Sequence, residues 1–395
     1  MSGGDARTTA AQDVPGRLMS LDALRGADMF LIIGGAGLVT ALCKWLGFGA
    51  DCWLADQMTH VMWHGFHQHD TIFPLFVFLA GAAWPFSYAK QRERGRTTGQ
   101  VVRKILVRVF LLALLGVADA RFFKFQFGSL RYDSILAHVG LCWGLAALLY
   151  VFVRSWKVRL AVAFGLLAVH WLVLFCFSAP DAAALLSSTD PVVAKLVKAY
   201  APWGTGNFSF TGNIANWMDR MFVPNVSVWD PDGLFAKVSG MALASFGVLA
   251  GEWLRSSSAS GNRKAQVLVG AGLGALVLCL VWSPLCPVNK KIWTSTFVLA
   301  AAVYSLFLLA LFYWIIDVRG WRAWSFFFRV IGLNSITIYV MGRFMNFDKM
   351  SLFFFSGIAD LGCELWGGVV FWFGVLTVEW LVLWHLYRQR IFLRV

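Results

Sequence analysis

The sequence predicts an all-α integral membrane protein of about ten transmembrane helices with an outer capping loop. Of its 395 residues, 59% are apolar and 14% are charged, whereas soluble domains average roughly 45–50% apolar and about 25% charged. The mean hydropathy is +0.66, with 20 Trp and 35 Phe residues. These values exclude a soluble, disordered or nucleic-acid-binding chain. The net charge of +13 has a simpler cause, because Lys and Arg gather in the cytoplasmic loops of membrane proteins.

Ten apolar stretches are long enough to cross a bilayer core of about 30 Å, which takes roughly 20 residues per helix. The expected spans are 22–43, 68–89, 101–119, 134–153, 158–178, 233–254, 265–285, 292–316, 325–345 and 365–387. The short run 351–358 suits a re-entrant or interfacial piece. We divide the chain into a cytoplasmic N-terminal segment (1–20), a first transmembrane group (21–178), an outer loop (179–232) and a second transmembrane group (233–395).

Basic residues alternate with these spans. Loop 90–108 holds seven Lys and Arg residues, and further basic clusters follow the fourth, sixth, eighth and tenth spans. The positive-inside rule places these loops in the cytoplasm, so both termini are expected there too. The N-terminal residues are polar, so we do not expect a cleavable signal peptide. These features fit a bacterial inner membrane best.

A cluster of histidines precedes the second span. Four of the seven His residues lie within ten positions, from His60 to His69, and Asp70 follows them. Residue types alone leave three interpretations open. The histidines could be interfacial polar residues, or His60 and His64 at i,i+4 could help to bind a metal ion. Alternatively, a histidine oriented by Asp70 could act as a general base or nucleophile, because its pKa lies near neutrality.

Ionisable residues within the expected spans are a second signal, because they are costly in hydrocarbon and are usually functional or paired. Asp22 and Arg25 open the first span three residues apart and can pair on one helix face. Asp28 and Glu379 lie deeper. Such acids suit a transporter as well as an enzyme.

Several short motifs follow one another along the chain. They are Arg17-Leu-Met-Ser-Leu-Asp-Ala-Leu-Arg-Gly26 continued by Asp28-Met-Phe-Leu-Ile-Ile-Gly-Gly35, His60-x-x-Trp63-x-Gly65 followed by Asp70-x-x-Phe-Pro74, Trp229-Asp-Pro-Asp-Gly233, Cys286-Pro-Val-Asn-Lys-Lys-Ile-Trp-Thr294, and Gly332-Leu-Asn-Ser-Ile336 with Tyr339. In this order they resemble the heparan-α-glucosaminide N-acetyltransferase family, and its NagX-like (DUF5009) bacterial branch in particular.

The resemblance implies a multi-span acetyltransferase that takes an acetyl group from acetyl-CoA on the cytosolic side and delivers it to an amino sugar on the far side. It also suggests a homodimer. The family's active-site histidine corresponds to His60. Two positions depart from the pattern: the family's asparagine on the first span falls near Ala36, and its VLQR motif reads Ile135-Leu-Ala-His138.

We therefore expect His60 to act as a base or acyl acceptor, with Asp70 orienting its ring. The residues expected to contact the acceptor or the thioester carbonyl are Trp63, Asn289, Lys290 and Asn334. Those expected to bind the phosphates of acetyl-CoA are Arg25, Arg103 and Arg108. No metal ion is expected. The alternative is an amino-sugar transporter that performs no acyl transfer.

Overall fold

The computed structural model describes residues 18–48, 52–117, 125, 134–200, 206–223 and 233–393. Its regular elements in these ranges are all helical, and the sole strand-like pairing described is one bridge between Ser178 and Asn213. The predicted all-α class is confirmed. Arg17, at the start of the first motif, and residues 229–232 of the Trp229–Gly233 motif lie outside the described residues.

The helices follow the expected order along the chain. The first part contains α1 (Met19–Phe30), η1 (Leu31–Gly35), α2 (Ala36–Trp45), α3 (Trp53–Asp56), η2 (Gln68–Thr71), α4 (Ile72–Glu93), α5 (Thr98–Val117), α7 (Ile135–Phe152) and α8 (Trp156–Cys176). Three short helices follow, α9 (Ala182–Leu186), α10 (Pro191–Tyr200) and α11 (Ile214–Phe222). The last part contains α12 (Ala236–Arg255), α13 (Gly261–Trp282), α14 (Ser295–Phe312), η6 (Tyr313–Val318), α15 (Ser325–Leu333), α16 (Ser335–Met341), α17 (Phe347–Ala359) and α18 (Glu364–Arg388).

Among the described residues, seven helices are long and apolar enough to cross a membrane by length and composition. They are α1–α2, η2–α4, α7, α8, α13, α14–η6 and α18. The other three expected spans correspond to α5, α12 and the broken pair α15–α16. Of these, α5 packs against α7, α12 against α4, and α15 against α1. The run 351–358 lies in α17, which packs against α18.

The first span is kinked rather than straight. A π-helical turn, η1, separates α1 from α2, and Gly34 within it has a φ of 142°. A side chain is strained at this φ, so glycine is required there. Trp372 and Leu376 of α18 pack against the kink.

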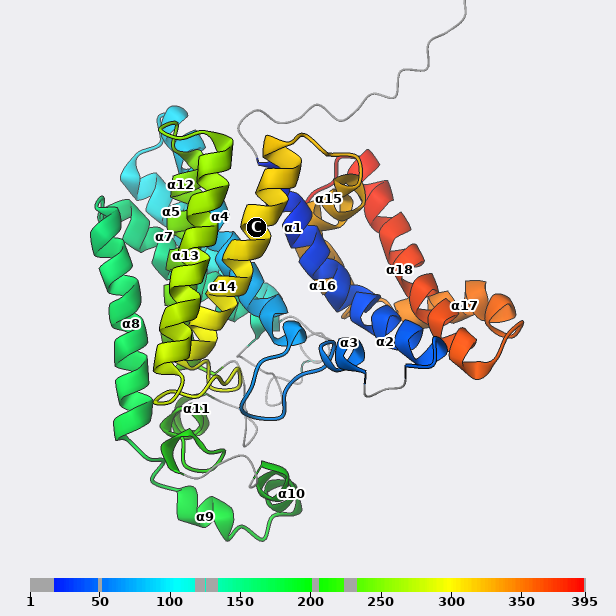
Figure 1. Cartoon of the computed structure of the whole chain (residues 1–395), viewed down its shortest axis with the longest axis horizontal. Helices are drawn as coiled ribbons and strands as arrows, with labels where there is room; N and C mark the ends of the chain where they lie inside the picture. Colours follow the sequence, from blue (N-terminus) through cyan, green and yellow to red (C-terminus); the bar gives the residue numbers. More distant parts are fainter. Residues whose placement is uncertain are drawn as a thin grey trace, which may run out of the picture.

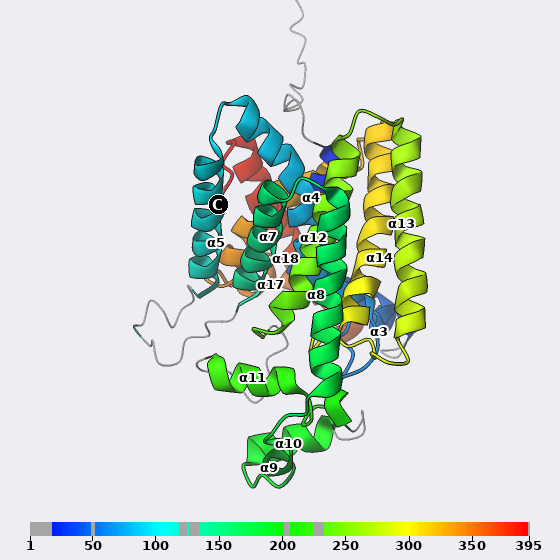
Figure 2. The same cartoon turned by 90° about the vertical axis from the view of Figure 1, so that its left-hand side faces the viewer.

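Helices from both expected transmembrane groups interleave. Figure 1 shows α4, α5, α7, α8, α12, α13 and α14 on one side of α1, with α15, α17 and α18 on the other. Two apolar cores match this arrangement, one centred on α4, α12 and α14 and the other on α15 and α18. The short helices α9, α10 and α11, which belong to the expected capping loop 179–232, lie beyond one end of the bundle (Figure 2).

The α4–α12 contact is a close approach of two backbones. A Cβ on Gly81 would meet the backbone oxygen of Ala244, and one on Gly247 would meet that of Phe78. Small residues at such contacts let membrane helices pack closely. Here they bring α4, which also lines the main cavity of the protein, against the central helix α12.

Gly247→Val tests this contact. The added side chain would force α12 away from α4, and we expect a loss of about 1–3 kcal/mol or more, typical of overpacking, seen as a lower melting temperature in detergent. Gly165→Val on α8 is the matched control, because nothing lies within 4 Å of a Cβ at Gly165. Equal destabilisation by both variants would contradict the packing argument.

Candidate active site

Two segments far apart in the sequence are paired beside the start of α4. The N–H of Gly65 donates to the carbonyl of Val288 at 2.9 Å, joining segment 60–70 to turn 286–294. Gly65 has a φ of 129°, a conformation that favours glycine. Two of the sequence motifs therefore meet at this point.

Turn 286–294 is ordered by its own polar side chains. The Asn289 N–H donates to the Thr294 hydroxyl at 3.0 Å, and the Asn289 side-chain oxygen accepts from the Ile292 N–H at 3.2 Å. Trp293 is fully buried, with its ring 5.3 Å from that of Phe73 between centroids. The turn is thus fixed at both ends, and Lys290 projects from it toward His60 and Asp70.

His60, Asp70 and Lys290 form one polar cluster. His60 Nδ1 lies 2.7 Å from Asp70 Oδ1, and Lys290 Nζ lies 3.1 Å from His60 Nδ1 and 3.5 Å from Asp70 Oδ1. A carboxylate can only accept, so His60 donates from Nδ1 and its Nε2 remains as the ring's acceptor. The structure therefore brings together His60 and Asp70, the residues proposed as the base and its orienting carboxylate.

Asp70 is buried, and the backbone around it holds it in place. Its Oδ2 accepts from the N–H groups of His67 at 3.2 Å and Val61 at 3.4 Å. A segment that returns on itself in this way brings positions 60 and 70 together, although their spacing is not a helical one. The His60 side chain keeps 44% of its surface exposed and can therefore meet a substrate.

His69 also lies beside His60, although no sequence motif distinguished it from the other histidines of the cluster. Its ring centroid lies 4.6 Å from that of His60, and its Nδ1 is buried without a hydrogen-bond partner among the described residues. The sequence signal was its membership of the histidine cluster, which did not distinguish one member from another.

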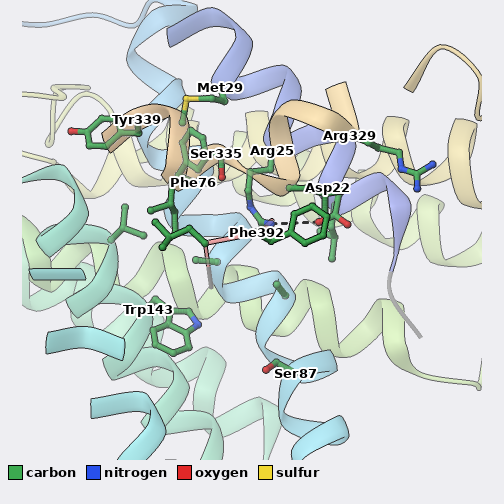
Figure 3. Close-up of a pocket in the computed structure, with 18 of the residues that line it drawn as sticks. Asp22, Arg25, Met29, Phe76, Ser87, Trp143, Arg329, Ser335, Tyr339 and Phe392 are labelled. Atoms are coloured by element: carbon green, nitrogen blue, oxygen red, sulfur yellow. Dashed lines mark ion pairs between the residues drawn. The ribbon is translucent and has the colours of Figure 1, made fainter. Parts of the chain in front are cut away.

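A single cavity of 2380 Å³ starts at these residues and follows α4. Its lining includes one face of the helix, at His69, Phe73, Phe76, Ala80, Ala83, Ser87, Lys90 and Arg94, positions that recur every three or four residues. At 1.5 Å per residue this face is roughly 35 Å long, close to the bilayer core of about 30 Å. Figure 3 shows part of the cavity, with side chains from several helices around it. The cavity therefore runs the length of a membrane span.

The two ends of this cavity differ in chemistry. We call the end lined by His60, His69 and Lys290 the histidine end. The opposite end, here the basic end, is lined by Arg25, Lys90, Arg94, Arg108, Arg255, Arg329, Arg388 and Arg390, against the acidic Asp22 and Glu93. These residues come from α1, α4, α5, α12, α15 and the end of α18.

Two arginines predicted from the sequence lie at the basic end. Arg25 forms an ion pair with Asp22 at 3.5 Å, drawn in Figure 3. The Arg108 guanidinium lies 4.4 Å from the centroid of the Trp143 ring, and its Nε is buried without a hydrogen-bond partner among the described residues. Arg103 does not line the cavity but is exposed on another face of α5.

Of the residues predicted to contact the acceptor or the thioester carbonyl, Lys290 lines the cavity, whereas Asn289 and Asn334 do not. Asn289 contacts His64, its Nδ2 donating to His64 Nδ1 at 3.2 Å. Burial lowers the pKa of His64, which favours the neutral ring that can accept this bond. Asn334 is buried between α15 and α16, and its neighbours Leu333 and Ser335 line the cavity in its place.

Trp63 packs against the expected capping loop rather than against the cavity. It is fully buried, and its Nε1 donates to the carbonyl of Phe208 at 2.8 Å. Its ring packs against Tyr200 and Phe210, so it ties segment 60–70 to the capping loop rather than lining the cavity.

The two departures from the family pattern lie in packed surroundings. Ala36 is buried at the start of α2. His138 is fully buried, and its ring centroid is 4.6 Å from that of Trp293. Within the described ranges, no group of three or more His, Cys, Asp or Glu residues is placed to hold a metal ion.

Trp63→Phe tests the contact with the capping loop. The variant keeps an aromatic ring but loses the indole N–H with its buried hydrogen bond and part of the packed ring system, and we expect it to destabilise the protein by about 1–3 kcal/mol and to speed proteolysis within 206–223. Trp53→Phe is the control, because Trp53 is 75% exposed. If Trp63→Phe left stability and proteolysis unchanged while weakening acceptor binding, Trp63 would be a substrate contact instead.

Comparisons with known proteins give two distant relatives. No family model matches the chain. It is 25% identical to heparan-alpha-glucosaminide N-acetyltransferase of Homo sapiens over 370 residues, which cover 83% of this chain and 53% of that protein. It is 26% identical to the protein of the same name from Mus musculus over 366 residues, 82% of this chain and 54% of that protein. The chain spans about half the length of these curated relatives. Distant homology over most of the chain therefore supports the heparan-α-glucosaminide N-acetyltransferase family.

Proposed function

We propose that this protein is a transmembrane acetyltransferase that moves an acetyl group from cytosolic acetyl-CoA to an amino sugar at the far side of the membrane. The observation that carries the proposal is the single cavity joining the basic end to His60. A donor with a charged nucleotide and a long, thin arm fits such a shape. The phosphates would lie among the arginines, and the arm would extend along α4 to bring the thioester to the histidine end.

The chemistry at the histidine end follows from the orientation of His60. An amine that attacks the thioester carbonyl forms a C–N bond and must lose a proton, and His60 Nε2 is the acceptor available for it. Collapse of the intermediate breaks the C–S bond, and the same proton passes to the departing thiolate of CoA. Asp70 holds the ring by its Nδ1–H, the role that a carboxylate has in a catalytic triad.

Lys290 has a role in the same step. Its Nζ lies 3.5 Å from His60 Nε2, beside the position at which the thioester carbonyl would be attacked. Negative charge develops on that oxygen, and a preorganised ammonium group stabilises it. An alternative route, in which His60 Nε2 first accepts the acetyl group and then passes it to the amine, uses the same residues.

The proposal also includes the bacterial branch of the family, the type of acceptor, the membrane and its topology, and the oligomeric state. The order of the motifs supports the NagX-like bacterial branch and a glucosamine-type acceptor. The basic residues at one end of the bundle support a cytoplasmic position for that end, both termini included, in a bacterial inner membrane. A homodimer is part of the proposal through the family resemblance alone.

His60→Ala is the first test. The protein is purified in detergent and supplied with acetyl-CoA, with and without glucosamine, and free CoA thiol is followed. Loss of a general base typically lowers the rate by about 10²–10⁴-fold, and we expect amine-dependent thiol release to fall in this range. His385→Ala is the matched control, since His385 is exposed and does not line the cavity.

The same assay separates the alternatives. Release of CoA by the wild-type protein without any amine would favour transfer to His60 or to water as the first step. No release, together with no effect of acetyl-CoA on the melting temperature, would contradict the acetyltransferase proposal. Uptake of glucosamine into vesicles without acetylation would favour the transporter.

The arginines at the basic end give a second test. Arg25→Gln and Arg108→Gln should each raise KM for acetyl-CoA about tenfold or more, because a hydrogen bond to a charged group contributes about 1.5–3 kcal/mol, with a smaller effect on kcat. Arg103→Gln is the matched control and should leave KM unchanged, because Arg103 does not line the cavity. A raised KM in Arg103→Gln alone would place the nucleotide outside the cavity.

A further inference from the structure

A second groove, of 510 Å³, lies on α5 apart from the main cavity. Its lining consists of Arg96, Gln100, Arg103, Lys104 and Val107, none of which lines the main cavity. Arg103 and Lys104 are exposed side chains on the first turns of α5. The groove therefore gathers three cations at one end of a predicted membrane span.

These three cations have no acidic partner among the described residues. Lys104 lies instead within electrostatic reach of the basic residues Arg94, Arg96 and Arg108. Like charges held together without a counter-charge raise the energy of the free protein and favour the binding of an anion.

The start of α5 adds to this attraction. Thr97 Oγ1 accepts from the Gln100 N–H at 3.3 Å, and Gln100 Oε1 accepts from the Thr97 N–H at 3.1 Å. This reciprocal capping fixes the first turn, whose remaining N–H groups carry the positive end of the helix dipole. A phosphate group is the common ligand of such an arrangement.

An apolar surface continues directly from the groove along the same helix. Leu106, Val107, Phe110 and Leu114 are all exposed, Phe110 by 66% of its surface. The opposite face of α5, at Leu112, packs against Gly140 of α7. A soluble phosphate would use only the cations, whereas a phospholipid would also cover this apolar surface.

We propose that the groove binds the phosphate of an anionic phospholipid, with its headgroup on Arg96, Arg103 and Lys104 and its acyl chains along Leu106 and Phe110. Basic pockets at the cytoplasmic ends of membrane helices recognise such headgroups. From Lys104 to Leu114 the helix rises about 15 Å, half of a bilayer core. The headgroup then lies at the interface and the chains lie in one leaflet. This site is independent of the proposed acetyl transfer.

The test measures the melting temperature of the full chain in detergent with added phosphatidylglycerol, phosphatidylcholine of the same chains, or inorganic phosphate at equal phosphorus. We expect phosphatidylglycerol to raise the wild-type value by about 3 °C more than either other addition, by mass action on the folded state. The double variant Arg103→Gln, Lys104→Gln should lose this increment. The double variant Arg154→Gln, Lys157→Gln should keep it, because both side chains are exposed away from the groove, Arg154 between α7 and α8 and Lys157 on the first turn of α8.

Three results would overturn the proposal. They are equal stabilisation by the two lipids, retention of the increment by the double variant, or an equal effect of inorganic phosphate, which would assign the groove to a soluble anion. If the double variant does not fold, native mass spectrometry of Arg103→Gln decides, with one bound phosphatidylglycerol fewer than wild type expected. An unchanged lipid count there would also overturn the proposal.

Discussion

The buried carboxylate of Asp70 is the constraint on which the arrangement of the site depends. A charge removed from water costs several kcal/mol unless it is paired and hydrogen-bonded. Asp70 meets this requirement with the His60 ring, the Lys290 ammonium and two backbone N–H groups. These partners come from segment 60–70 and from turn 286–294, so satisfying one carboxylate fixes two distant segments at the start of α4. His60 is thereby oriented as a consequence of the fold.

The helix α4 begins just after Asp70 and connects this carboxylate to the rest of the molecule, because one of its faces lines the cavity and another packs against α12. Ala80 and Ala83 line the cavity, while the residues between them, Gly81 and Ala82, meet the backbone of α12. Small side chains are required on both faces, but for different reasons. On one face they allow the two backbones to touch, and on the other they leave a passage open through the bundle. A larger residue at Gly81 or Ala82 would disturb the packing against α12, whereas one at Ala80 or Ala83 would narrow the passage.

The sequence predicted the helices well and the side-chain contacts unevenly. Apolar length and loop charge are properties of each segment alone, and the expected spans fall on helices of the structure. The pairing of His60 with Asp70 was also proposed, although their spacing required a turn that no local pattern specifies. The contact of Trp63 with Phe208 crosses 145 residues of sequence. The sequence carried no signal for this contact, because the presence of a tryptophan in a motif does not show whether its side chain contacts a substrate or a loop.

The arginines of α5 show why loop charge cannot assign a binding role. Arg103 and Arg108 both satisfy the positive-inside rule, and their residue type is the same. Five residues on a helix correspond to a rotation of about 140° from one side chain to the other. One guanidinium therefore lies in the cavity over Trp143, while the other is exposed above the apolar face of the same helix. The positive-inside rule determines which side of the membrane receives the charge, and helical phase determines whether that charge meets the cavity or the surrounding lipid.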